Sequence, residues 1–270
     1  MATIPIKEPV ITLSAGPVAC YPRVLRAMSR PVHYDFDPFF QHVYERTVRK
    51  LTRALRTREP ALVLHCEPAP GLEACAASLI GPHDVVLNLV SGVYGKGFGY
   101  WAARYAKEVL EIEVPYDQAI DPADVAKAFK RRKDIKVVSV VHHDTPSGTL
   151  NPVTEIGRIV RDHDALLLVD AVSSFAGMDI HPDDCHADVF VTGPGKCLGG
   201  PPGLTIVAMS RRGWKHIARN PKAPTASILS LADWKDAWRH DRPFPFTPSV
   251  ADVNGLDGCL DQYLDEGPKA

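Results

Sequence analysis

The sequence reads LLVDAV at residues 167–172, VFVTGPGKCL at residues 189–198 and GGPPG at residues 199–203. An aspartate, Asp170, therefore closes one apolar run, and Lys196 stands in a glycine- and proline-rich turn after the next. Short apolar runs of this kind predict buried strands, so the two side chains are expected at neighbouring strand ends. An amine there can form a Schiff base with a pyridine aldehyde, and a carboxylate can keep the pyridine nitrogen protonated.

Strands and helices alternate along the rest of the chain. Several of the apolar runs are apolar throughout, which is typical of a parallel sheet buried on both faces. The predicted strands cover residues 61–64, 84–90, 108–114, 135–141, 165–169 and 204–209, with a further strand from Val189 that ends before the stretch from Thr192 to Lys196. The predicted helices cover residues 22–28, 37–57, 71–80, 95–106, 121–130, 153–163 and 250–264, with a short helix from Arg211. The predicted fold class is therefore α/β, with a mainly parallel sheet and helices on both faces.

Polar, aromatic and glycine residues follow the predicted strands. Glu67 comes after the first strand, Tyr94 after the second, and Thr145 after the strand that ends at Val141. Because ligands of such sheets bind beyond the carboxyl ends of the strands, these residues are expected near Asp170 and Lys196.

Composition excludes several classes of partner. The chain has 270 residues, 45% of them hydrophobic and 23% charged, with a formal net charge of -1. Such a charge gives no reason to expect nucleic acid or a membrane surface as partner. No apolar run reaches the ~20 residues of a membrane span, and no signal peptide is visible. The six cysteines show no metal-type spacing, so we expect no metal site, reduced thiols and a cytoplasmic protein.

Residues 221–249 lack periodicity and are rich in proline and aromatic residues, including Trp234 and Trp238. A long structureless stretch is unusual within a compact domain. Its aromatic content suits a subunit contact, and we expect a homodimer or homotetramer.

Together these stretches resemble the class V, fold-type I pyridoxal-phosphate aminotransferases. The resemblance extends from the Gly16-Pro17 turn to the last helix, and its most specific parts are DAVSS at residues 170–174 and KCLGGPPG at residues 196–203. It implies that Lys196 is the aldimine lysine and that Asp170 pairs with the pyridine nitrogen. It also implies that Tyr94 stacks on the ring and that Thr145 hydrogen-bonds near the ring hydroxyl.

One turn departs from the general pattern of the class. Ordinary members hold the cofactor phosphate with a glycine-, serine- or threonine-rich turn at a helix N-terminus, where this chain has Glu67-Pro68-Ala69-Pro70-Gly71. The two prolines remove N–H donors. A phosphate some 4 Å from the Glu67 carboxylate would be repelled by several kcal/mol at an effective dielectric constant of ~20. The Pro194-Gly195 turn removes further donors, so the site is expected to suit a ring without its phosphate.

The departure points to a narrower group of members, which take free pyridoxal and pyridoxamine as substrates. The matching stretches are SGVYGKGFGYW at residues 91–101, HHDTPSG at residues 142–148 and PFPFTPS at residues 243–249. The resemblance implies transfer of the amino group of pyridoxamine to pyruvate, giving pyridoxal and L-alanine in vitamin B6 degradation. Glu67 would accept a hydrogen bond from the free 5′-hydroxymethyl group, and no tightly bound cofactor is expected. His142 and His143 are expected to be structural.

Other interpretations remain open at this stage. Tyr94 can be a packed aromatic, Thr145 can cap its own turn, and Glu67 can pair with an arginine. The whole chain can be an ordinary class V aminotransferase of the alanine/serine–glyoxylate type that uses bound pyridoxal phosphate.

The resemblance also bears on the domain organisation, because family members continue into a smaller C-terminal domain, which supplies the arginine that binds the carboxylate of the keto acid. We therefore expect an N-terminal arm (1–20), a large α/β domain (21–248) and the start of a helix (249–270) that leads to an absent small domain, and a non-catalytic remnant is a further alternative.

Overall fold

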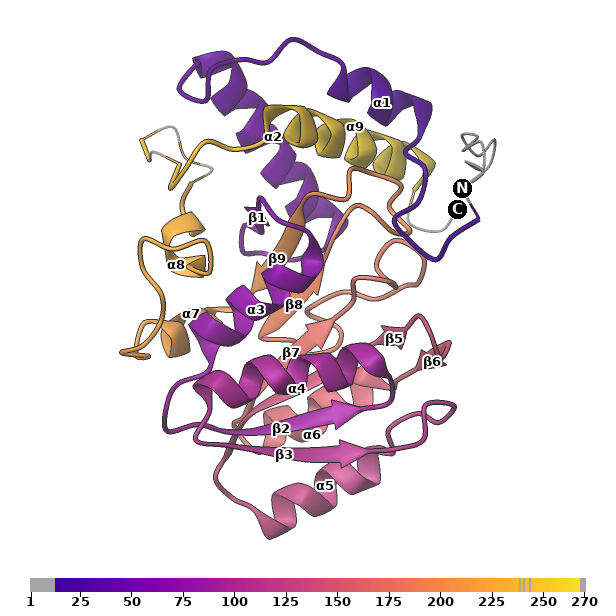
Figure 1. Cartoon of the computed structure of the whole chain (residues 1–270), viewed down its shortest axis with the longest axis vertical. Coiled ribbons are helices and arrows are strands. Elements are labelled where there is room, and N and C mark those ends of the chain that lie inside the picture. The colour runs from indigo at the N-terminus through magenta and orange to yellow at the C-terminus, as the bar shows by residue number, and fades with distance from the viewer. Residues whose placement is uncertain (1–12, 238, 240, 243, 268–270) are drawn as a thin grey trace, which may run out of the picture.

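A computed structural model describes residues 13–237, 239, 241–242 and 244–267. A seven-stranded sheet forms its centre, in the order β1-β9-β8-β7-β4-β2-β3 (Figure 1). Its strands are β1 (Leu62–Leu64), β2 (Val85–Val90), β3 (Glu108–Glu113), β4 (Ile135–Val141), β7 (Leu166–Asp170), β8 (Val189–Thr192) and β9 (Thr205–Met209). Residues 1–12 of the predicted arm, Trp238, Pro243 and residues 268–270 lie outside the described residues.

The sheet is mainly parallel, which confirms the predicted fold class. Strands β3, β2, β4, β7 and β8 pair in parallel, whereas β9 is antiparallel to both β8 and β1. A parallel return from β8 would need a crossover, usually helical, and here the connection from residue 193 to residue 204 instead folds as the turn that carries Lys196. A small hairpin of β5 (His143–Asp144) and β6 (Thr149–Leu150) was not predicted, because two-residue strands have no periodicity to read.

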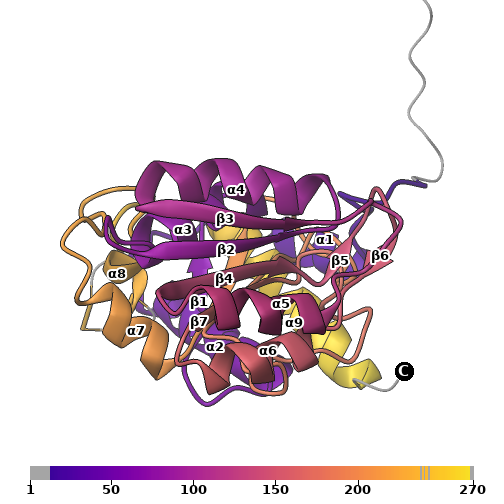
Figure 2. The same cartoon turned by 90° about the horizontal axis from the view of Figure 1, so that it is seen from below.

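Helices cover both faces of the sheet, with α3 (Pro68–Leu79) and α4 (Val93–Tyr105) on one side and α5 (Pro122–Arg131) and α6 (Val153–Asp162) on the other (Figure 2). A group of three helices, α1 (Pro22–Met28), α2 (Pro38–Ala54) and α9 (Val250–Glu266), packs together (Figure 1). Proline stands in the first turn of α1, α2, α3 and α5, where its missing N–H costs no helical hydrogen bond. In the described part of the chain, no helix is long and apolar enough to cross a membrane.

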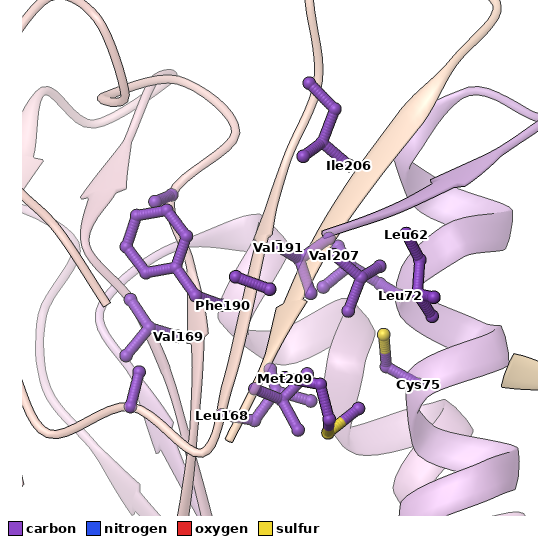
Figure 3. Close-up of a cluster of buried hydrophobic side chains, with 14 of the residues drawn as sticks. Leu62, Leu72, Cys75, Leu168, Val169, Phe190, Val191, Ile206, Val207 and Met209 are labelled. Carbon is purple, nitrogen blue, oxygen red and sulfur yellow. The ribbon is translucent and has the colours of Figure 1, made fainter. Parts of the chain in front are cut away.

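One part of the hydrophobic core lies between α3 and the strands β8 and β9 (Figure 3). Leu72 and Cys75 of α3 are buried on the side of the sheet that carries Val191 and Val207. Phe190 directly precedes Val191 on β8, and its side chain points to the opposite face of the sheet, because successive residues of a strand alternate between the two faces. Both faces of the central strands are therefore buried, and the polar groups that follow these strands gather at the sheet's edge.

The stretch 221–249 is partly ordered, in contrast to the prediction of a structureless segment. Helix α7 (Arg211–Ile217) precedes it, and α8 (Leu231–Trp234) lies within it, with the Ser230 side chain accepting the Asp233 N–H. A four-residue helix is too short to show periodicity, which explains the miss. Trp234 is buried within the chain and its ring lies near those of Phe244 and Phe246, so part of the aromatic content serves internal packing.

His65 is anchored in this aromatic cluster. Its Nδ1 accepts the Ser249 N–H at 3.1 Å, its ring lies 5.0 Å from the Trp234 ring, and burial lowers its pKa to about 4. The folded chain therefore resists protonation of His65, whereas the unfolded chain takes up the proton near pH 6.5.

The free energy of unfolding is consequently expected to fall as the pH drops from about 6.5 to about 4, by up to about 3 kcal/mol for this group at ~1.4 kcal/mol per pKa unit. Urea unfolding at pH 7, 5.5 and 4.5 measures this dependence. His65→Gln should make the dependence shallower and leave the share of His142, whose pKa burial also lowers to about 4. His83→Gln, at an exposed position, should leave the dependence unchanged. If the free energy of unfolding depends on pH equally in the wild-type and His65→Gln chains, the lowered pKa of His65 is contradicted.

Candidate active site

A cavity of about 450 Å³ opens beyond the carboxyl ends of β4 and β7. All five residues selected from the sequence line it, namely Glu67, Tyr94, Thr145, Asp170 and Lys196. Asp170 ends β7, Tyr94 lies in the first turn of α4, and Glu67, Thr145 and Lys196 lie in three connections. The parallel strands bring these segments together beyond the strand ends. The structure thus brings the five residues together, and their individual roles stay predictions.

Asp170 is the last residue of β7 and is only 8% exposed. Its Oδ1 accepts the Val172 N–H at 2.9 Å. Burial raises the pKa of the carboxyl to about 6, and the negative charge of Asp144 adds to the rise, while the Val172 N–H and the Lys196 ammonium oppose it. A nearby cation strongly stabilises the charged form of a buried carboxyl group. A protonated pyridine nitrogen is such a cation.

Lys196 stands in the turn between β8 and β9. The Gly199 N–H donates to the Lys196 carbonyl at 2.9 Å, and Gly199 has a φ of +70°, a conformation that favours glycine. The turn therefore fixes the lysine backbone. At the other end of the side chain, Nζ donates to the carbonyl oxygen of Ala15 at 3.3 Å.

Asp144 holds Tyr94 and Thr145 in place. It is fully buried, and its Oδ2 accepts the Tyr94 N–H at 3.2 Å at the start of α4. A Cβ at Gly92 would lie only 2.1 Å from this carboxylate, so glycine is required there. Asp144 thus fixes the helix end that carries Tyr94 and is the neighbour of Thr145 in sequence. The sequence reasoning missed it, although its position directly before Thr145 was visible.

The interpretations left open for these residues find little support in the structure. Tyr94 is 48% exposed, unlike a packed core aromatic. The turn after Asp144 is closed by Ser147 and Gly148, which both donate to the Asp144 carbonyl. Within the described residues, Glu67 forms no ion pair.

His143 also lines the cavity, although it was expected to be structural. The Ser173 hydroxyl donates to the His143 carbonyl, and Ser173 Oγ lies 3.0 Å from His143 Nδ1. Since the hydroxyl proton is already used, His143 Nδ1 is the donor of the second bond. His142, by contrast, is buried against Ser174 outside the cavity, and burial lowers its pKa to about 4.

The family model for aminotransferase class-V matches residues 100–266, more than half of the chain. The chain belongs to the class V aminotransferases. It is 61% identical over 263 residues to pyridoxamine–pyruvate transaminase of Mesorhizobium japonicum, an alignment that covers 97% of this chain and 67% of the relative. The crystal structure of pyridoxamine–pyruvate aminotransferase from Mesorhizobium loti superposes with a TM-score of 0.96, again at 61% identity and covering 97% and 67% of the two chains.

More distant members share the fold. The crystal structure of alanine–glyoxylate aminotransferase from Nostoc sp. superposes with a TM-score of 0.92 at 25% identity, covering 100% of this chain and 72% of that one. The chain spans about two thirds of the length of its curated relatives, 67%, 65% and 66% for three of them.

Membership of the class V aminotransferases corrects the prediction about the cofactor. Class V aminotransferases of this kind depend on pyridoxal phosphate, so the expectation that no cofactor is tightly bound is wrong. The cavity residues fit the pyridoxal ring of that group, since a buried carboxylate with a raised pKa and a lysine amine line the same cavity. At the N-terminus of α3, Pro68 and Pro70 lack N–H groups and the Gly71 N–H already donates to the Glu67 carbonyl at 3.3 Å. The ring is therefore the part of the cofactor that these residues fit best.

Proposed function

We propose that this protein transfers the amino group of free pyridoxamine to pyruvate, giving pyridoxal and L-alanine. The same activity is named for its 61% identical relative. The exchange is balanced without an outside oxidant, because the amino group and the carbonyl oxygen change places between the two compounds.

The observation that carries this proposal is the position of Glu67. Glu67 lines the cavity beside Pro68, and no salt bridge to it is found among the described residues. A carboxylate accepts hydrogen bonds and repels a phosphate. Glu67 therefore suits a free hydroxymethyl group, which can donate a hydrogen bond to it.

A bound pyridoxal compound supplies a carbonyl or amine at C4′ and a ring that takes up electron density. In this proposal Asp170 holds a proton on the ring nitrogen. As general base and acid, Lys196 would move a proton from C4′ to the α-carbon that pyruvate supplies. It would then attack C4′ as a nucleophile, which releases L-alanine, and water would release pyridoxal and restore the lysine amine. Tyr94 and Thr145 orient the ring from the α4 and β5 sides of the cavity.

A second candidate function is that of an ordinary class V aminotransferase of the alanine/serine–glyoxylate type, which does not take free pyridoxamine as a substrate. Membership of the class and the fold shared with alanine–glyoxylate aminotransferase favour it. The two candidates differ in whether the cavity accepts the compound without phosphate, and a spectral titration with pyridoxal and with pyridoxal phosphate separates them.

In this titration the wild-type chain is expected to bind free pyridoxal as well as pyridoxal phosphate. Glu67→Gln should shift the ratio of the two affinities toward the phosphate by at least about tenfold, a difference of ~1.4 kcal/mol, because it removes the negative charge and keeps the shape of the side chain. Glu73→Gln is the matched control, since Glu73 lies on the helix that follows Glu67 and pairs with Arg104. Failure of the wild-type chain to bind free pyridoxal would favour the second candidate.

We also propose a homodimer or homotetramer and a cytoplasmic location. Aromatic side chains stand exposed in the connection between α1 and α2, including Tyr34 at 70% and Phe36 at 50%, and these suit a subunit contact. The six free cysteines suit a reducing compartment.

A further inference from the structure

The segment from Ser14 to Tyr21 is bound along the turn that carries Lys196, although some 180 residues separate them in sequence. The Val18 N–H donates to the Gly195 carbonyl at 3.0 Å, and the Tyr21 N–H donates to the Gly199 carbonyl at 3.2 Å. Two backbone hydrogen bonds therefore fix the segment on both sides of the lysine.

Gly16 touches the lysine side chain directly. A Cβ built at this position would lie 2.3 Å from Lys196 Cδ, 2.5 Å from Nζ and 2.7 Å from Cε. Gly16 also has a φ of +135°, which side chains rarely allow. Any other residue at this position would displace the reactive amine or the segment itself.

We propose that the Ala15–Gly16 backbone is a positioning element for Lys196. The Ala15 carbonyl accepts a hydrogen bond from the free amine, and the surface of Gly16, which has no side chain, contacts the end of the lysine side chain. A lysine side chain can adopt many rotamers. The contact with Gly16 and the hydrogen bond to the Ala15 carbonyl together favour the rotamers that point into the cavity. The Ala15 carbonyl then holds the amine whenever the amine carries no substrate.

This inference rests on the proposed function, in which Lys196 reacts with a pyridoxal compound. Gly267 offers a matched control, because its φ of +83° also favours glycine, a Cβ there would meet nothing within 4 Å, and it does not line the cavity. The experiment compares Gly16→Ala with Gly267→Ala. The rate of covalent capture of pyridoxal at Lys196 is followed by borohydride reduction and mass spectrometry. The affinity for pyridoxine, which has no carbonyl to react, is measured alongside.

Gly16→Ala is expected to slow capture at least about tenfold while pyridoxine affinity stays within about twofold of wild type. Gly267→Ala is expected to change neither quantity. Capture at the wild-type rate in Gly16→Ala would overturn the inference, and so would a parallel loss of pyridoxine binding, which would indicate a general structural role. Failure of the wild-type chain to capture pyridoxal would instead count against the proposed function.

A stability cycle tests the contact without any ligand. Lys196→Ala removes the three atoms that a Cβ at Gly16 would meet. The drop in Tm caused by Gly16→Ala should therefore be larger, by at least about 2 °C, when Lys196 is present than in the Lys196→Ala background. Equal drops in the two backgrounds would show that Gly16 acts through its own backbone conformation and would overturn the positioning role.

Discussion

Lys196→Ala is expected to abolish covalent capture of pyridoxal and to lower the transamination rate by at least about 10³-fold, because both the nucleophile and the proton carrier are lost. No other lysine is found among the described residues that line the cavity, so none is placed to take over. Borohydride reduction followed by mass spectrometry of the peptide that contains residue 196 measures the capture directly.

The matched control is Lys96→Ala, on the helix that carries Tyr94. The Lys96 amine is held by Glu111 at 2.6 Å and Glu113 at 2.9 Å, so it does not reach into the cavity. This variant should retain capture at about the wild-type rate. A Lys196→Ala chain that still transferred amino groups would show that another group performs the proton transfer, and the assignment of Lys196 would have to be abandoned.

The sequence predicts best those strands that are buried on both faces along their whole length. The runs that become β4 and β7 are apolar from end to end because helices cover both faces, and the polar residue that ends such a run marks the sheet's edge. Asp170 could therefore be placed at a strand end from local pattern alone. The direction of β9 could not, because it depends on how the chain returns after Lys196.

The candidate site also contains residues that the local sequence predicts and contacts that it does not. Glu67, Tyr94 and Thr145 follow strands directly, so the topology of a parallel sheet brings them together. The contact of Gly16 with Lys196 and the hydrogen bond from Tyr94 to Asp144 join segments far apart in the chain, and nothing local in the sequence marks either. Family resemblance supplied the individual roles, and it also led to the wrong expectation about the cofactor.

Asp170→Asn is expected to stabilise the ligand-free chain at neutral pH while lowering the transamination rate by about 10²–10⁴-fold. Burial raises the pKa of this carboxyl to about 6, whereas in the unfolded chain it titrates near 3.9. Its contribution to stability is therefore fully present below about pH 4 and is lost as the pH rises through 6. At pH 7 the folded chain carries a buried charge that costs up to about 3 kcal/mol, at ~1.4 kcal/mol per pKa unit.

Asparagine removes that charge and keeps an oxygen that can accept the Val172 N–H. Urea unfolding should thus show a gain for Asp170→Asn at pH 7 that disappears near pH 4, whereas Asp117→Asn, at an exposed position, should change the free energy of unfolding by less than ~0.5 kcal/mol at either pH. A loss of stability at pH 7 would mean that the carboxylate is already compensated in the empty site. If the gain is found together with lost activity, the buried charge is maintained at the expense of stability because the ring nitrogen needs it.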